Sequence, residues 1–151
     1  MIILEQVISG GQTGVDQIAL LIAQALGYKT GGTVPKGWRT DDGPAPWLSI
    51  YGCVESYDTG YRVRTIKNVR DADATVWFGI MSPGYQLTKR AADIESRHRL
   101  YFWLENPTAA QLAEWLHNPI RILNVGGNRA GTHTGAWKQA EIVLRSALRP
   151  D

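Results

Sequence analysis

A glycine-rich stretch at residues 9–16, Ser-Gly-Gly-Gln-Thr-Gly-Val-Asp, constrains this chain more than any other feature. It follows an apolar run at residues 2–8 that is typical of a strand, and it precedes an apolar segment at residues 16–26 that is typical of a helix. Glycine lets a backbone approach a ligand closely, and a helix N-terminus offers unpaired amides and a partial positive charge. The stretch therefore predicts an anion-binding loop, most often for phosphate. The alternative is a plain structural turn, which would need one glycine and a cap.

This loop supplies five predicted ligand-binding residues, namely Gly10, Gly11, Gln12, Thr13 and Gly14. The nearby Asp16 has two open interpretations. It either complements the positive end of the helix dipole or lies near a bound metal or a ligand hydroxyl.

The rest of the chain alternates short apolar runs with longer segments of helical periodicity. This alternation predicts one α/β domain over residues 1–151, with a mainly parallel sheet and helices on both faces. Residues 31–49, rich in Gly, Pro, Asp and Thr, are predicted to form a long irregular loop that is either mobile or functional. Strands are expected at residues 2–8, 74–80, 100–104 and 120–125, with a fifth near 29–34. Helices are expected at residues 16–26, 57–69, 86–99, 108–117 and 134–148.

Two further loops follow predicted strands, and ligands of parallel sheets bind beyond the carboxyl ends of the strands. The second of these loops contains Arg129, whose planar guanidinium matches the geometry of a phosphate or another oxyanion. Both loops are therefore predicted to join the site, with an ordinary turn and a solvated arginine as the alternatives. The predicted residues are Ser82, Pro83, Gly84, Leu87 and Thr88 in the first, and Gly126, Gly127, Asn128 and Arg129 in the second.

The predicted helix at residues 57–69 carries a polar face. Tyr61, Arg64 and Asn68 recur at helical spacing and share this face. Such a face is usually just solvated, but this one adjoins the long loop and the end of the sheet. Arg64 and Asn68 are therefore predicted to contact the ligand.

Composition excludes several classes of function. The single cysteine, Cys53, rules out an internal disulfide and a cysteine-rich zinc site, and the net charge of +2 with scattered basic residues argues against nucleic-acid binding. No apolar stretch reaches the ~18 to 20 residues of a membrane span, and no signal peptide is recognisable. We therefore expect a cytoplasmic protein. The three histidines lack metal-ligand spacing and no catalytic constellation stands out, so neither metal ligands nor catalytic residues are predicted.

A series of motifs runs in the same order along nearly the whole chain. They are residues 9–16, 25–27, 30–32, 35–37 and 42–44, Tyr61 with Arg64-Thr65 and Asn68-Val69, residues 71–75, Ser82-Pro83-Gly84 with Leu87-Thr88, and Asn124-Val125 with Asn128-Arg129. Together they resemble the molybdenum cofactor carrier protein family. No single motif is decisive, and the resemblance depends on all of them being in register.

The resemblance implies a Rossmann-like three-layer fold, related to the lysine-decarboxylase-like phosphoribohydrolases. It implies a non-enzymatic carrier that binds molybdenum cofactor (molybdopterin), a pterin dithiolene with a terminal phosphate, or a related anion such as molybdate or phosphate. It further implies a homo-oligomer, either a dimer or a tetramer, and a molybdoenzyme as the recipient of the cargo.

Two alternatives stay open, a nucleotide-processing enzyme of the phosphoribohydrolase-like group and a nucleotide-sensing module. The phosphoribohydrolases carry Pro-Gly-Gly-x-Gly-Thr-x-x-Glu, and placing Pro83-Gly84 and Thr88 on this pattern puts Ala91 at the glutamate. Alanine handles no protons, so binding is favoured over hydrolysis. An enzyme would have to use Asp16 or Glu95 instead.

Overall fold

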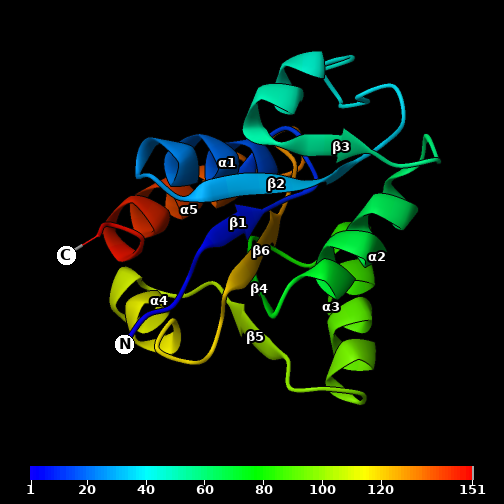
Figure 1. The fold of residues 1–151 in the computed structure, drawn as a ribbon. Helices are drawn as coiled ribbons and strands as arrows, with labels where there is room; N and C mark the ends of the chain where they lie inside the picture. The colour runs from blue at the N-terminus through cyan, green and yellow to red at the C-terminus, as the bar shows by residue number, and fades with distance from the viewer. Residues whose placement is uncertain (151) are drawn as a thin grey trace.

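The computed structural model describes residues 1–150 and contains a six-stranded sheet with the strand order β3-β2-β1-β6-β4-β5. Every strand pair is parallel (Figure 1). The strands are β1 (Gln6–Ile8), β2 (Lys29–Val34), β3 (Cys53–Glu55), β4 (Ala74–Phe78), β5 (Phe102–Glu105) and β6 (Ile122–Gly127). The helices are α1 (Val15–Ala25), α2 (Tyr61–Asp71), α3 (Pro83–Ser96), α4 (Ala109–Trp115) and α5 (Thr134–Ala147), with a 3-10 helix η1 (Pro46–Tyr51).

Helices cover both faces of the sheet. α1, α4 and α5 pack together on one face, and α2 and α3 pack together on the other (Figure 1). The predicted α/β, Rossmann-like three-layer architecture is therefore confirmed, and the sheet is wholly rather than mainly parallel. No helix within residues 1–150 is long and apolar enough to cross a membrane.

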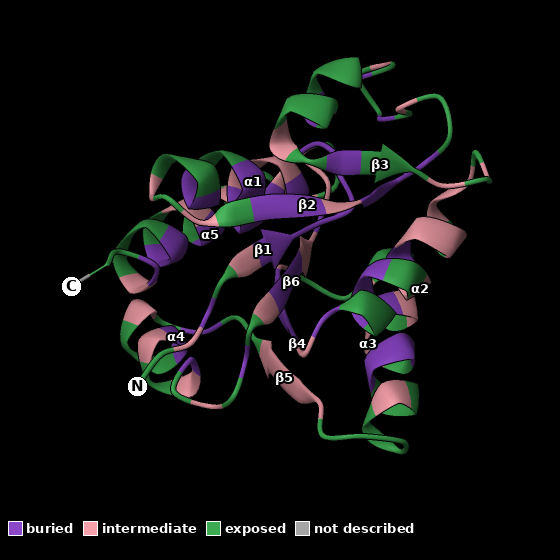
Figure 2. Cartoon of the chain, viewed as in Figure 1, coloured by how far each residue is buried: buried purple, intermediate pink, exposed green. Residues whose placement is uncertain are grey.

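The main hydrophobic core lies between the sheet and α1, α4 and α5. Val7, Phe78 and Leu123 of the sheet meet Ile22 of α1 and Leu144 of α5 there, all with at most 1% of their surface exposed. Buried residues accordingly concentrate along the central strands (Figure 2). The opposite face has only a small apolar cluster under α2 and α3, so the sheet is packed unevenly on its two sides.

The tertiary structure changes several predicted boundaries. The first strand begins at Gln6 rather than at residue 2, and α3 begins at Pro83 because the Ser82 side chain caps it by accepting a hydrogen bond from the Tyr85 amide (3.1 Å). The fifth predicted strand is present as β2. The sixth strand, β3, was not predicted, because three residues at a sheet edge carry too little periodicity to detect.

The long loop predicted at residues 31–49 is wrong in part, since its first residues belong to β2 and its last residues belong to η1. The Gly-Gly pair that suggested a loop instead lies inside β2, where Gly32 allows close packing against the segment after β1. A Cβ on Gly32, at φ +128°, would stand 2.0 Å from the Ser9 carbonyl oxygen. Residues 35–45, between β2 and η1, contribute the buried Ala45 to a second core cluster, which also contains Leu20 and Leu48.

The strand order positions the site. β6 returns to the middle of the sheet and lies between β1 and β4. The loops that leave the carboxyl ends of β1, β6 and β4 therefore leave three adjacent strands. These are the three glycine-containing loops that the sequence singles out, and they meet where the strand order reverses.

Candidate functional site

A cleft of ≈ 480 Å³ lies beyond the carboxyl ends of β1, β6 and β4, with one wall formed by α2. Most of the sequence-predicted residues line it. They are Gln12 of the β1–α1 loop, Arg64 of α2, Ser82, Pro83, Gly84, Leu87 and Thr88 around the start of α3, Gly126 and Gly127 at the end of β6, and Asn128 and Arg129 directly after it.

Five predicted residues do not line the cleft, and they are Gly10, Gly11, Thr13, Gly14 and Asn68. The glycines among them provide close packing. A Cβ on Gly11 would stand 2.6 Å from Val34 Cγ1, and one on Gly14 would stand 2.7 Å from the Asn128 carbonyl oxygen. Gly14 therefore allows the loops after β1 and β6 to touch. The Thr13 hydroxyl oxygen is buried and has no hydrogen-bond partner within residues 1–150.

Two amides of the β1–α1 loop, those of Gln12 and Thr13, are occupied by nearby side chains. The Gln12 amide donates to Asp16 Oδ2 (3.2 Å), and the Thr13 amide donates to Gln12 Oε1 (2.9 Å). The sequence predicted that these amides would be exposed to a ligand. These two amides are therefore already bonded, whereas Arg64 and Arg129 bring positively charged side chains to the cleft lining.

Asn68 lies behind the cleft wall and is engaged with β2. Its Oδ1 accepts a hydrogen bond from the Thr33 amide (2.7 Å), and its Nδ2 donates to the Thr33 carbonyl oxygen (2.9 Å). The residue is 2% exposed. Its amide group therefore ties α2 to the sheet and faces backbone rather than the cleft.

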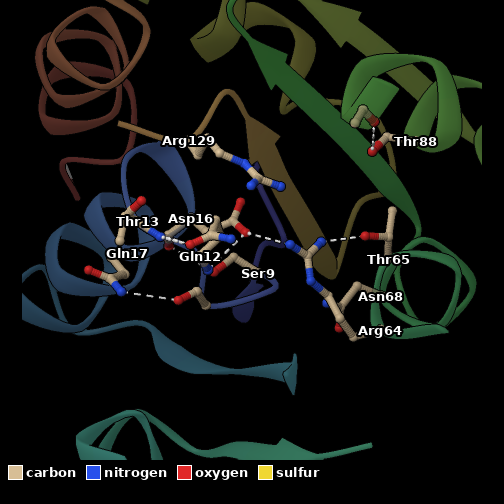
Figure 3. Close-up of polar contacts among 12 residues, drawn as sticks. Ser9, Gln12, Thr13, Asp16, Gln17, Arg64, Thr65, Asn68, Thr88 and Arg129 are labelled. Atoms are coloured by element: carbon tan, nitrogen blue, oxygen red, sulfur yellow. Dashed lines mark hydrogen bonds and ion pairs between the residues drawn. The ribbon is translucent and has the colours of Figure 1, made fainter. Parts of the chain in front are cut away.

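Arg64 reaches from α2 toward Asp16 at the start of α1 (Figure 3). Its Nη2 lies 3.7 Å from Asp16 Oδ2, and its Nη1 donates to the Thr65 hydroxyl. The guanidinium is buried, and its Nε has no hydrogen-bond partner among the described residues. Arg64 is thus an incompletely bonded cation inside the cleft, where an unpaired buried donor is costly.

Asp16 supplies the carboxylate that lines the cleft, and no other carboxylate of the described residues does so. Burial raises the pKa of Asp16 above its ordinary value, while Arg64, the Gln12 amide and Arg129 act in the opposite direction. Burial also lowers the pKa of Arg64. The pair therefore carries a strong desolvation cost with only a long ionic contact to offset it.

A second group of cations surrounds Tyr61 at the cleft wall. The guanidinium carbons of Arg39, Arg64 and Arg129 lie 4.8, 5.4 and 5.0 Å from the centre of its ring. Arg129 also pairs with Asp41 at 3.1 Å. These three guanidiniums come from the 35–45 loop, from α2 and from the β6–α5 loop, so only the folded chain brings them together.

Sequence reasoning missed part of this arrangement. Arg39 and Asp41 are ordinary residues of a polar loop by sequence, and Trp77 lies in an apolar strand where it is typical of a core residue. Tyr61 was recognised only as part of a polar helix face, although its spacing from Arg64 indicated that they were neighbours. Tyr61, Thr65, Trp77 and Thr132 line the cleft in addition to the predicted residues.

Asn128 holds the loop after β4 in place. Its Oδ1 accepts from the Ile80 amide (2.7 Å), and its Nδ2 donates to the Ile80 carbonyl oxygen and to Ser82 Oγ (both 3.2 Å). Across the cleft, Thr88 Oγ1 donates to the Gly84 carbonyl oxygen (2.8 Å) within α3 (Figure 3). Both side chains thus shape the cleft wall through bonds to backbone.

The two α3 positions considered for glycosidic hydrolysis, Ala91 and Glu95, do not line the cleft, whereas Asp16 does. Ala91 is buried with Val69 in the cluster between α2 and α3. Glu95 accepts a hydrogen bond from Arg99 Nε (3.0 Å) on the same helix. No group of three or more His, Cys, Asp or Glu side chains within residues 1–150 is placed to hold a metal ion together.

A parallel sheet with helices on both faces and a cleft at the strand ends defines a Rossmann-like α/β domain. The chain belongs to the circularly permutated YpsA SLOG family, whose model matches residues 7–148. It is similar to the crystal structure of the "Putative molybdenum carrier protein" from Syntrophus aciditrophicus SB, with 29% identity and a TM-score of 0.86 over 97% of this chain and 96% of that chain. No curated protein sequence matches the chain.

Proposed function

We propose that this protein is a non-enzymatic carrier that binds molybdenum cofactor, or a related anion such as molybdate or phosphate, in the cleft beyond β1, β6 and β4. The observation that carries the proposal is the buried guanidinium of Arg64, whose Nε lacks a partner within residues 1–150. An anion would supply the missing acceptor. The similarity to a protein named as a molybdenum carrier supports this choice of cargo.

The residues of the cleft fit such a cargo. Its volume of ≈ 480 Å³ lies within the roughly 300–1,000 Å³ of small-molecule sites. Arg64 and Arg129 would hold the terminal phosphate or the oxyanion through charge-assisted hydrogen bonds. Trp77, Pro83 and Leu87 offer apolar surface to a flat ring system, and the cofactor itself would supply the molybdenum.

Calorimetric titration with phosphate, molybdate and a pterin tests the proposal. Arg129→Ala should weaken anion binding by about 1.5–3 kcal/mol, because it removes a charge-assisted hydrogen bond. Arg121→Ala is the matched control, since Arg121 pairs with Glu5 on the exposed surface (2.8 Å) and does not line the cleft. Equal affinities in the wild type and Arg129→Ala would contradict a role for Arg129, and no binding of any of the three ligands would contradict the carrier.

One observation favours a second candidate function, the hydrolysis of a nucleotide at its N-glycosidic bond. Asp16 is a cleft carboxylate whose pKa is raised by burial, as acid–base groups often are. Incubation with nucleoside monophosphates, followed by chromatography for released base, separates the two functions. Release by the wild type and not by Asp16→Asn would favour the enzyme.

A carrier needs a recipient, and we infer a cytoplasmic molybdoenzyme in that role. Ile80 and Met81, 51% and 69% exposed, lie in the β4–α3 loop beside the cleft and support a protein contact there. We also infer a homo-oligomer, a dimer or a tetramer. Light scattering after size-exclusion chromatography measures this directly, and a monomer at all concentrations would overturn it.

A further inference from the structure

The 35–45 loop, between β2 and η1, contacts residues that line the cleft and is internally ordered. The Thr40 amide donates to the Gly43 carbonyl oxygen (3.2 Å), and the Ala45 amide donates to the Trp38 carbonyl oxygen (2.8 Å). The buried Thr40 also donates through its hydroxyl to Gly43 (2.6 Å). This turn holds Asp41 in a defined position.

Asp41 contacts the cleft at two of its polar residues. Its amide donates to Gln12 Oε1 (3.0 Å), and its Oδ1 accepts from Arg129 Nη1 (3.1 Å) and from Gln12 Nε2 (3.5 Å). Both Gln12 and Arg129 line the cleft, whereas Asp41 does not. The Asp41 carboxylate therefore occupies donors that an anionic ligand would use.

The charges around the cleft are unequal. The guanidiniums of Arg39, Arg64 and Arg129 gather on Tyr61 and face the carboxylates of Asp16 and Asp41, which leaves one positive charge. Withdrawal of the Asp41 carboxylate from the cluster leaves two positive charges. A doubly charged anion would then neutralise the cluster, whereas a singly charged anion would not.

The contact between Asp41 and Arg129 is weak enough to be displaced. The side chains of Asp41 and Arg129 are 34% and 40% exposed. An ion pair with this degree of exposure favours the paired over the unpaired state by a factor of only about two to five. The pair of Arg64 with Asp16 differs, because those side chains are only 13% and 7% exposed.

We propose that Asp41 is a built-in competitor for the anion site, and that the ligand group that displaces it from Arg129 is a tetrahedral dianion such as a phosphate monoester or molybdate. This inference rests on the proposed anion-binding function. Asp41 is a specificity-determining residue in this scheme, because only the charge of a dianion replaces its carboxylate and also neutralises the remaining cation.

Calorimetry with molybdate at pH 8 tests the inference. Asp41→Asn removes the charge and keeps the backbone contact to Gln12, so it should bind molybdate about two- to tenfold more tightly than the wild type. Asp42→Asn is the matched control, because Asp42 is exposed and forms no ion pair within residues 1–150. It should bind as the wild type does.

The gain in molybdate affinity from Asp41→Asn should depend on Arg129. Asp41→Asn is therefore also made in an Arg129→Ala background, where this gain should vanish. Perrhenate, a tetrahedral monoanion, should bind the wild type at least about tenfold more weakly than molybdate. Unchanged or weaker binding by Asp41→Asn, a gain that persists without Arg129, or equal affinities for the two oxyanions would each overturn the inference. Failure of folded wild type and of folded Asp41→Asn to bind any anion would instead overturn the proposed function.

Discussion

The guanidinium of Arg64 packs against the Cα of Gly10, so that a Cβ built on residue 10 would stand 2.7 Å from Arg64 Cζ. Arg64 Nε and Nη1 would be equally crowded, at 2.8 Å. The glycine after β1 therefore makes room for the cation of the neighbouring helix. We therefore expect Gly10 to affect anion binding indirectly, through the position of Arg64.

Gly10→Ala should weaken molybdate binding by roughly tenfold and leave the fold intact. The crowded atoms belong to the far end of a flexible side chain, so Arg64 moves and the backbone does not need to. A displaced guanidinium loses much of a charge-assisted contact. Calorimetry and thermal unfolding measure the two effects. Gly131→Ala, which adds a methyl group in open space, is the control, and equal affinity in Gly10→Ala would show that Arg64 does not act on the ligand.

Asn68→Ala should lower the free energy of unfolding by about 2–4 kcal/mol, because it leaves the buried amide and carbonyl of Thr33 without partners. Urea unfolding measures this loss. The neighbouring Lys67→Ala removes only an exposed pair with Asp71 and should cost less than about 1 kcal/mol. Where the folded Asn68→Ala protein still binds molybdate as the wild type does, Asn68 is structural; a large loss of affinity would restore it as a ligand contact.

Asn128→Asp should reduce molybdate affinity by more than about tenfold. A carboxylate still accepts from the Ile80 amide, but it cannot donate to the Ile80 carbonyl oxygen or to Ser82, and it adds negative charge to the cleft. Asn118→Asp loses a comparable bond to the Trp115 carbonyl oxygen after α4, away from the cleft. If both variants lowered affinity equally, the effect would not lie in the cleft.

Cys53 should resist alkylation in the native protein at pH 8. Burial raises its pKa to about 12 from an ordinary 9.0, so the thiol stays protonated and unreactive. Because the folded pKa is the higher one, the stability linked to this thiol is full below pH 9 and is lost as pH rises toward 12. A thiol reagent with and without urea measures the protection. In Cys53→Ala the stability between pH 9 and 12 should fall less steeply; equal slopes would contradict the linkage.

The local sequence pattern was sufficient to predict much of the architecture. Apolar runs alternating with helical periodicity predicted a parallel sheet covered on both faces, and parallel strands place their carboxyl ends on one edge. The loops containing Gln12, Ser82 and Arg129 could therefore be assigned to one site before their contacts were known. Arg64 was found in the same way, because helical spacing and loop position are local properties.

Residue type and spacing do not specify which neighbour a side chain contacts. The roles of the remaining predicted residues depend on those contacts, so the sequence could not assign them. Asn68 was indistinguishable from Arg64 as a polar residue of α2, yet β2 takes up its whole amide. Gly11 resembled a ligand glycine, but the space it leaves is filled by Val34 and Leu48.

The sequence by itself determined the alternation of helices with five of the six strands, the edge of the sheet where the predicted site residues gather, and the arginines available there, because each follows from short-range periodicity and chain direction. Only the tertiary structure decided that Asp41 pairs with Arg129, which lies 88 residues away, and that three guanidiniums surround Tyr61. Such contacts form when distant loops close on one another, and their geometry depends on the packing of the whole sheet.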